Sequence, residues 1–305
     1  MQEYGGIIKE VEMKKLFLLL AALALIPGYC LAAGLEYFQV YTPKDGMSAD
    51  EIMQIEYFVK YTRFAHDVKM LGKSYFVDKA GGVREKATSR TRITLGRKSD
   101  DIAYKDLVIF TTPQVRGMGT LTWTYMNPAK QPDSWLWIPS LKKIRKISAS
   151  NSDDSFLGSD FTVEDILTRK FEDETYVLKG SENFKGYTCE FNKKTYFAGV
   201  PCFVIEARPK KSPWYYSKRM LWVDKSTGGG IYEEKYDVTG RIYQTIFKNF
   251  EIFNVNNKAY PTQTLLEVKD LRTGHRTVIT NDNIKYDQGL KEDLFSERSL
   301  MQSRW

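Results

Sequence analysis

The chain has 305 residues, which is enough for one large β domain or for two smaller domains. Hydrophobic residues make up 42% of it and charged residues 27%, a balance that is typical of a folded globular protein. The net charge of +7 favours anionic lipid headgroups or nucleic acid as partners, or simply keeps the protein soluble. Lys and Arg are spread along the chain without the dense block of a nucleic-acid-binding tail, so we expect no nucleic-acid partner.

The N-terminal residues have the pattern of a targeting signal. Met13-Lys14-Lys15 precedes an apolar run from Leu16 to Ile26, and the small residues Ala32 and Ala33 follow shortly afterwards. This order of basic, apolar and small regions is that of a secretory signal peptide. The run is too short for a membrane-spanning helix, which needs about 20 residues. We expect cleavage after one of the two alanines, with translation starting at Met1 or at Met13.

Cys30 raises the alternative of a lipid-anchored protein. The residue before a lipidated cysteine is normally small, whereas here it is the bulky Tyr29. We therefore expect Cys30 to be removed with the signal peptide. The predicted organisation is an N-terminal extension and signal peptide over residues 1–33 and a single domain over residues 34–305.

One helix is predicted after the signal. Ser48 and Glu51 have the spacing of a capping box, in which each side chain accepts a hydrogen bond from the other residue's backbone. Ile52, Ile55 and Val59 then recur at i, i+3 and i+7, which places them on one helical face.

Most of the remaining chain has the pattern of β-strands. Apolar and polar residues alternate in Thr120–Tyr125, Ile231–Val238 and Arg241–Phe250, and glycine-containing turns such as residues 228–230 separate the runs. We expect eleven or more strands. Because few helices lie between them, the sheet should be antiparallel and of the meander type.

A Ser-, Asn- and Asp-rich stretch over residues 148–160 interrupts the strands and leads into a second short helix. Thr162 can cap this helix, with Asp165 three residues further on. A large antiparallel sheet with one apolar face can stack on a second sheet, close into a barrel or wrap around helices. Two short helical segments are too few to cover the sheet, so a sheet curled around them would leave an apolar hollow of the kind that holds a lipid tail.

Two cysteines remain in the mature chain, Cys189 and Cys202. An even number of cysteines in an oxidising compartment predicts a disulfide, and each lies in a strand-like run with a turn between them. The alternative is two free buried thiols.

The motifs of common catalytic and cofactor sites are absent from the sequence. His66 and His275 are the two histidines, and neither has a second ligand at metal spacing. There is no P-loop, no Gly-x-Ser-x-Gly and no dinucleotide fingerprint. We therefore expect no enzyme activity, no metal and no cofactor, although a Ser-His-Asp triad can assemble in space from distant residues.

Two kinds of charged cluster have the composition of possible binding or catalytic sites. Asp153-Asp154 and Glu172-Asp173-Glu174 could serve a glycosidase or bind calcium, but charge runs usually face water and we expect these to do so. The basic run of residues 142–146 lies beside Trp135 and Trp137, a combination that can bind single-stranded nucleic acid. In an exported protein, we expect this run to bind an anionic headgroup or simply to form a solvated strand edge.

Three blocks in the middle of the chain resemble a known family. They are Gly117–Trp123, Trp135–Ile147 and Ser155–Ile166, of which the third is the most specific. In this order they are similar to the outer-membrane lipoprotein-sorting proteins, which are related to the LolA and LolB lipoprotein carriers. The resemblance covers approximately Tyr61 to Tyr286.

The resemblance implies a mainly β fold in which a large curved antiparallel sheet, an incomplete barrel, wraps around a few lid helices over an apolar cavity. It implies a non-enzymatic carrier, either free in the periplasm or associated with the outer membrane, that binds a lipid or a lipoprotein acyl chain. An RND-type transporter is an implied partner, and we expect a monomer. The arginine that locks the lid in lipoprotein carriers has no recognisable counterpart, so another lipid is an equally good cargo.

Ten residues are predicted to border the cavity, either as aromatic or aliphatic members of alternating strands or as members of the family-specific block: Leu121, Trp123, Tyr125, Trp137, Phe156, Phe161, Ile166, Trp222, Tyr232 and Tyr236. Any one of them could instead be ordinary core. Two other functions stay open: an accessory protein that docks on an export system and carries nothing, and an envelope hydrolase.

Overall fold

The computed structural model describes residues 42–96, 101–147 and 153–302. The predicted signal peptide, its cleavage site and Cys30 lie outside these residues. Within the described residues, no helix is long and apolar enough to cross a membrane.

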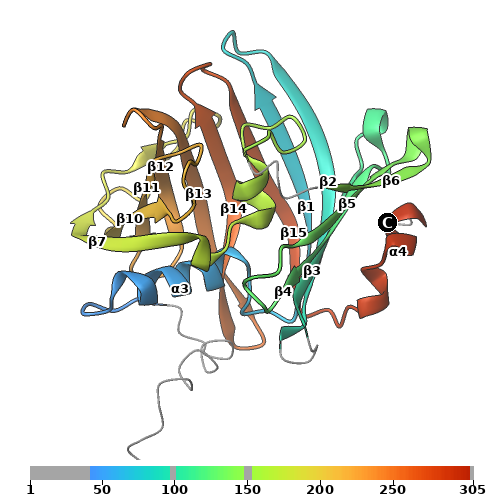
Figure 1. Cartoon of the computed structure of the whole chain (residues 1–305), viewed down its shortest axis with the longest axis horizontal. Helices are drawn as coiled ribbons and strands as arrows, with labels where there is room; N and C mark the ends of the chain where they lie inside the picture. The colour runs from blue at the N-terminus through green and yellow to red at the C-terminus, as the bar shows by residue number, and fades with distance from the viewer. Residues whose placement is uncertain (1–41, 97–100, 148–152, 303–305) are drawn as a thin grey trace, which may run out of the picture. The chain divides into compact units, whose positions relative to one another are not determined.

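Thirteen of the described strands form one antiparallel sheet that does not close, as the sequence predicted (Figure 1). The first six strands are β1 (Asp67–Val77), β2 (Val83–Thr94), β3 (Ile102–Phe110), β4 (Gly119–Tyr125), β5 (Asp133–Ile138) and β6 (Lys143–Ile147). The other seven are β7 (Glu174–Asn183), β10 (Pro201–Pro209), β11 (Lys218–Asp224), β12 (Gly230–Tyr236), β13 (Ile242–Val255), β14 (Lys258–Asp270) and β15 (Arg276–Tyr286). A separate hairpin pairs β8 (Tyr187–Thr188) with β9 (Thr195–Tyr196).

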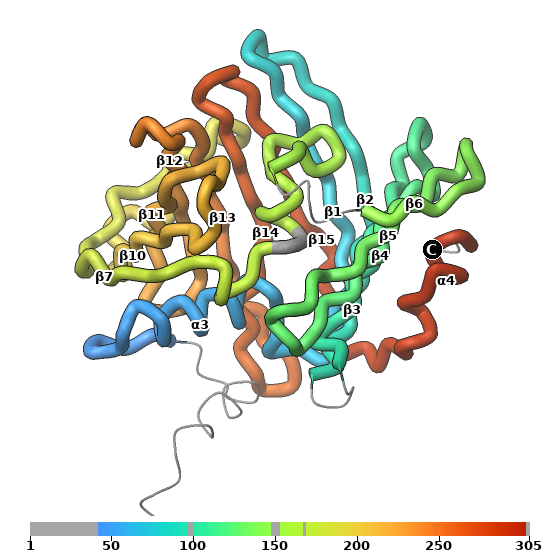
Figure 2. Tube along the Cα trace, in the orientation of Figure 1, coloured from blue at the N-terminus to red at the C-terminus, as the bar shows by residue number. Residues whose placement is uncertain are grey.

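The strand order shows how the chain builds this sheet. It runs β6-β5-β4-β3-β2-β1-β15-β14-β13-β12-β11-β10-β7. The chain therefore starts in the middle with β1, meanders out to the β6 edge, crosses to β7 at the opposite edge, and meanders back until β15 pairs with β1. The described part of this crossing, residues 153–173, is called here the crossover segment. It lies in front of the sheet in Figure 2.

Helix α3 (Ala49–Lys60) confirms the helix predicted from the capping box. Ser48 and Glu51 exchange both capping hydrogen bonds, and Ile52, Ile55 and Val59 are all buried. Ile52 packs with Ile205 of β10 and with other residues of β10 and β11. We call this side of the sheet the inner face, because the crossover segment lies on it as well.

The crossover segment contains the second predicted helix, in an unexpected form. Thr162 and Asp165 cap each other, with backbone-to-side-chain distances of 3.0 and 3.1 Å. The turn that follows, Glu164–Thr168, is a π-helix, closed by a hydrogen bond from the Arg169 N–H to the Glu164 carbonyl at 3.1 Å. Single π-helical turns of this kind are frequent at functional sites.

Two short elements cover parts of the opposite, outer face. Leu300 of α4 (Glu297–Gln302) and the preceding Phe295 pack on Leu107 and Leu121. Around the β8–β9 hairpin, the ring of Tyr187 stacks on Phe247 with centroids 4.4 Å apart. Both faces of the sheet are therefore partly covered.

The predicted disulfide is not formed: Cys189 and Cys202 are buried free thiols. The prediction required the two cysteine-containing runs to pair with each other. Instead, the Cys189 N–H bonds the Lys194 carbonyl in the small hairpin, while Cys202 pairs in register with Glu182 of β7 and Asp224 of β11. The two cysteines thus belong to different hydrophobic clusters.

Candidate functional site

An apolar cavity of about 140 Å³ lies between the inner face and the crossover segment. Its walls come from the middle of the sheet, on strands β1–β4, β14 and β15, and its cover comes from the crossover segment. The apolar side chains that line it include Phe76, Val108, Phe110, Phe161, Leu266 and Ile279.

Strand alternation explains which residues reach the cavity. Val108 and Phe110 of β3 line it, whereas Leu107 and Ile109, one residue away, pack in the cluster of the outer face. Gly72 of β1 also lines the cavity, and a Cβ there would lie 2.8 Å from the hydroxyl of Thr88. Any larger side chain at this position would therefore take up part of the hollow.

Three of the ten predicted cavity residues line the cavity: Phe156, Phe161 and Ile166. All three come from the block that carries the family resemblance. Phe161 is 2% exposed and packs with Ile246 and Val268, which fastens the middle of the crossover segment to the sheet.

Leu121, Trp123 and Trp137 lie on the outer face. The prediction that Leu121 and Trp123 share one face is correct, but that face packs against Phe295 and α4. The indole N–H of Trp123 donates to the Phe295 carbonyl at 3.1 Å. The cavity is lined on β4 by the polar residues Thr120 and Thr122, which alternate with Leu121 and Trp123 along the strand.

Trp222 and Tyr232 are also outside the cavity. They are cross-strand neighbours of each other and Tyr232 is paired with Phe247, so all three rings belong to the outer face beside the β8–β9 hairpin. Tyr236 is four positions after Tyr232 on β12 and therefore points to the same outer face, where its hydroxyl donates a hydrogen bond to Glu234.

Tyr125, at the end of β4, does not line the cavity either. It donates a hydrogen bond to Asp133 at 2.6 Å.

The cavity contains one ion cluster on its sheet side. Asp106 of β3 accepts hydrogen bonds from Arg90 and Arg92 of β2. Burial by itself would raise the pKa of Asp106, but the two guanidinium groups outweigh it and hold the pKa well below its usual range. Arg92 also donates to the Tyr61 carbonyl at 2.6 Å, which ties the end of α3 to the sheet.

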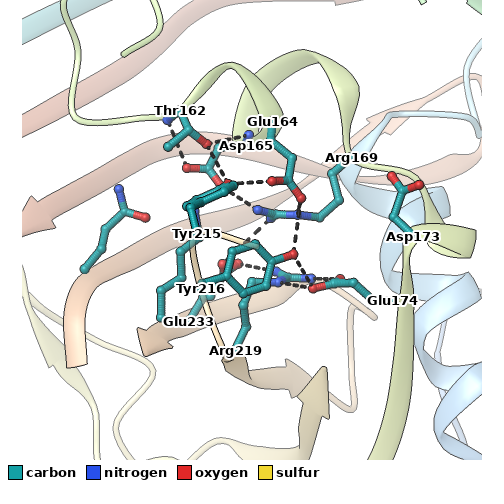
Figure 3. A network of polar contacts seen from close by, with 12 residues as sticks. Thr162, Glu164, Asp165, Arg169, Asp173, Glu174, Tyr215, Tyr216, Arg219 and Glu233 are labelled. Atoms are coloured by element: carbon teal, nitrogen blue, oxygen red, sulfur yellow. Dashed lines mark hydrogen bonds and ion pairs between the residues drawn. The ribbon is translucent and has the colours of Figure 1, made fainter. Parts of the chain in front are cut away.

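A second, larger ion network fastens the crossover segment to the sheet (Figure 3). Arg169 contacts Glu164 at 3.0 Å and Asp165 at 2.9 Å, and lies 3.8 Å from Glu233 of β12. Lys235 of β12 reaches Asp165 at 2.5 Å.

Arg219 of β11 extends the same network. It contacts Glu233 at 2.9 Å and Glu174 at 2.8 Å. Tyr216 donates to Glu174 at 2.8 Å and to Glu164 at 3.2 Å, so it joins the crossover segment to the start of β7. We call these residues the buried ion network: Glu164, Asp165, Arg169, Glu174, Tyr216, Arg219, Glu233 and Lys235.

The pKa shifts in the network follow from this pairing. Burial raises the pKa of Glu233, but Arg219 and Arg169 outweigh it and lower the pKa to about 2. Asp165 is shifted in the same direction against burial, by Lys235 and Arg169. Glu233 and Asp165 are therefore charged at neutral pH and bind the segment to the sheet as ions.

The network corrects one expectation and contains residues that were not predicted. Glu172 and Asp173 are exposed, as expected for a charged run, but Glu174 is buried against Arg219. Arg169 was not predicted because its partner on β12, Glu233, is more than 60 positions away, and only the Glu164–Asp165–Arg169 spacing is visible locally.

No group of three or more potential ligands that could hold a metal ion occurs among the described residues. The acidic residues near the cavity form ion pairs with Arg and Lys, and His275 pairs with Asp160 at 2.7 Å. This arrangement holds chain segments together and encloses an apolar space.

Solved structures of other proteins share the fold of this chain. A LolA superfamily protein from Nitrosomonas europaea shares the fold, with a TM-score of 0.56, 18% identity, and coverage of 83% of this chain and 100% of that one. A structure from Vibrio parahaemolyticus, named "putative outer membrane lipoprotein-sorting protein domain", has a TM-score of 0.67 at 22% identity. The match covers 83% of this chain and 98% of that one.

A DUF1329 family protein from Desulfovibrio piger has a TM-score of 0.68 at 25% identity, over 83% of this chain and 99% of that one. A family model described as "Uncharacterized protein" matches residues 103–302. Among curated proteins, none matches the chain. The chain belongs to the family of that model, and it shares its fold with the lipoprotein-sorting and LolA superfamily structures, as the sequence resemblance predicted.

Proposed function

We propose that the protein is a periplasmic carrier that binds a lipid or the acyl chain of a lipoprotein in the cavity under the crossover segment, for traffic to the outer membrane. The observation that carries the proposal is this apolar hollow, covered by a separate segment that contributes Phe156, Phe161 and Ile166. Burying a chain there removes about 0.8 kcal/mol of unfavourable hydration per methylene group.

The cavity size implies that loading moves the crossover segment. Its volume of about 140 Å³ is close to the roughly 150 Å³ of an engineered apolar cavity that admits benzene, so it accepts a small apolar group but not a whole acyl chain. When the segment moves away, water hydrates both members of its buried ion pairs, and each methylene group of the ligand that is buried offsets about 0.8 kcal/mol of the remaining cost. The crossover segment is then the lid and the buried ion network its fastening.

A binding titration with the fluorescent apolar probe N-phenylnaphthylamine tests the proposal on the mature chain. Ile166→Glu places a charge on the cavity wall and should weaken binding about tenfold or more. Val238→Glu is the matched control, because Val238 is 73% exposed and does not line the cavity. Circular dichroism should be the same for both variants.

Two results would contradict this function. If Ile166→Glu bound the probe as well as Val238→Glu, the cavity would not be the site. If the wild type bound no apolar probe, a docking protein on an export system would be the better interpretation. An RND-type transport partner and a monomeric state stay predictions.

A further inference from the structure

A second, polar hollow of about 70 Å³ adjoins the apolar cavity. The two share five lining residues, Arg90, Phe161, Ile166, Gln263 and Leu266, so they lie against each other beneath the crossover segment. The volume is several times the roughly 10–15 Å³ that one water molecule needs, so there is room for a small charged group. We call this hollow the inner chamber.

Cations outnumber carboxylates around the inner chamber. Its lining includes four basic side chains and two acidic ones: Lys60, Arg90, Arg169, Lys248, Asp165 and Glu233. The two arginines have close partners of their own, since Arg90 binds Asp106 at 2.6 Å and Arg169 binds Asp165 at 2.9 Å.

The two lysines are less well compensated. The side chain of Lys248 is 7% exposed, and its ion-pair partner Glu56 is 3.8 Å away, which is beyond hydrogen-bonding distance. Lys60, the last residue of α3, has no ion pair with any residue that the structure describes, and its ammonium lies 5.6 and 5.1 Å from the ring centroids of Tyr57 and Tyr61.

The electrostatics of both lysines favour an added anion. Burial lowers the pKa of Lys60, and Arg169 lowers it further. Burial also lowers the pKa of Lys248, and Lys60 adds to this effect although Glu56 opposes it. Lys248 is a buried cation without a close counterion and Lys60 is half-buried, so an anion between the two ammonium groups would compensate an unfavourable concentration of positive charge.

We propose that the inner chamber binds the anionic headgroup of an amphipathic lipid, a carboxylate or a phosphate, whose hydrocarbon chain occupies the apolar cavity. Lys60 and Lys248 are the binding residues for the headgroup. Phe161 and Ile166 mark the boundary between the charged and the apolar parts of the ligand, because they line both hollows. This inference rests on the proposed carrier function and adds to it the class of lipid and its orientation, with the headgroup inward.

Hexadecanoate and hexadecanol are the probes that separate the headgroup from the chain, because they differ in charge but share a hydrocarbon tail. Wild-type protein should bind the acid about ten- to a hundredfold more tightly than the alcohol, as expected for hydrogen bonds to a charged group. Lys60→Met should reduce this ratio to about threefold or less while alcohol binding stays unchanged. Lys60→Arg should keep the preference for the acid.

Lys69→Met is the matched control, since Lys69 is exposed on β1 and lines neither hollow. It should behave as wild type. Lys60→Met should also be at least as resistant to thermal unfolding as wild type, because it removes an uncompensated charge. If it unfolded much more easily or failed to fold, Lys60 would have a structural role, and the ratio of acid to alcohol binding measured on Lys248→Met would decide: an unchanged ratio there would overturn the inference.

The results separate this inference from the proposed function. If acid and alcohol bound equally and the lysine variants changed nothing, the headgroup inference would fail while the carrier function stood. If neither bound, both would fail. If inorganic phosphate alone bound as tightly as hexadecanoate and Lys60→Met abolished this binding, the inner chamber would be a site for a free anion and not for a lipid.

Discussion

Replacing Arg169 with methionine tests whether the buried ion network holds the crossover segment on the sheet. Arg169 contacts Glu164 and Asp165 within the segment and approaches Glu233 of β12. Methionine is similar in length but uncharged, so these carboxylates would lose a cation in a place that excludes water. We expect a less stable protein whose crossover segment detaches from the sheet more often.

The magnitude follows from the burial of the pair. The side chain of Arg169 is 1% exposed, and removing one partner of such a buried pair costs about 3–5 kcal/mol. Arg208 forms an ion pair of 2.7 Å with Glu206, but its side chain is 53% exposed, and exposed pairs contribute about 0–1 kcal/mol. Arg208→Met is therefore the matched control for loss of an arginine.

Urea unfolding at neutral pH measures the free energy of unfolding of both variants. Hydrogen exchange over residues 153–173 reports whether the segment itself is released. Adding Glu164→Gln to Arg169→Met should recover part of the loss, because it removes one of the uncompensated carboxylates. If both arginine variants lost the same free energy of unfolding, less than about 1 kcal/mol, the buried ion network would not be what holds the crossover segment on the sheet.

Three further predictions concern other parts of the molecule. Because the pKa of Glu233 falls from 4.5 to about 2 on folding, the stability that its charge provides is complete above about pH 4.5 and is lost as the pH falls towards 2. Between these values, the free energy of unfolding should therefore depend less on pH in Glu233→Gln than in the wild type. The same pH dependence in both proteins would contradict the pairing. Leu300→Ala should cost about 2–5 kcal/mol in thermal or urea unfolding, since Leu300 is fully buried, while a change at the exposed Met301 should cost less than about 0.5 kcal/mol. Burial raises the pKa of Cys189 to about 11 and that of Cys202 to about 12, so iodoacetamide near neutral pH should label both thiols only after unfolding; an intact mass showing a disulfide in the exported protein would contradict the free thiols.

Features set by neighbouring residues could be predicted from the sequence. The capping box of Ser48 and Glu51, the mutual capping of Thr162 and Asp165, and the shared face of Leu121 and Trp123 all formed as expected. Each depends on contacts within a few positions or on the two-residue period of a strand, so the local sequence is sufficient.

Features that depend on distant segments could not be predicted. The alternation of apolar and polar residues in β4 shows that Leu121 and Thr122 point to opposite faces of the sheet. It does not show which of these faces the crossover segment covers. The apolar residues were therefore assigned to the cavity, although α4, nearly 180 residues later in the chain, covers them. The cavity wall on this strand is formed by threonines instead.

The ion network and the cysteines follow the same rule. Arg169 meets Glu233, and Lys60 lies beside Lys248, because the chain crosses the sheet and returns from the far edge, which brings residues far apart in sequence together. Cys189 and Cys202 stay apart because strand register places other partners opposite each of them. The sequence by itself determined the strands, their two faces and the helix caps, since these are local; only the tertiary structure decided which face encloses the cavity and which charges meet there, because that depends on how distant strands pair.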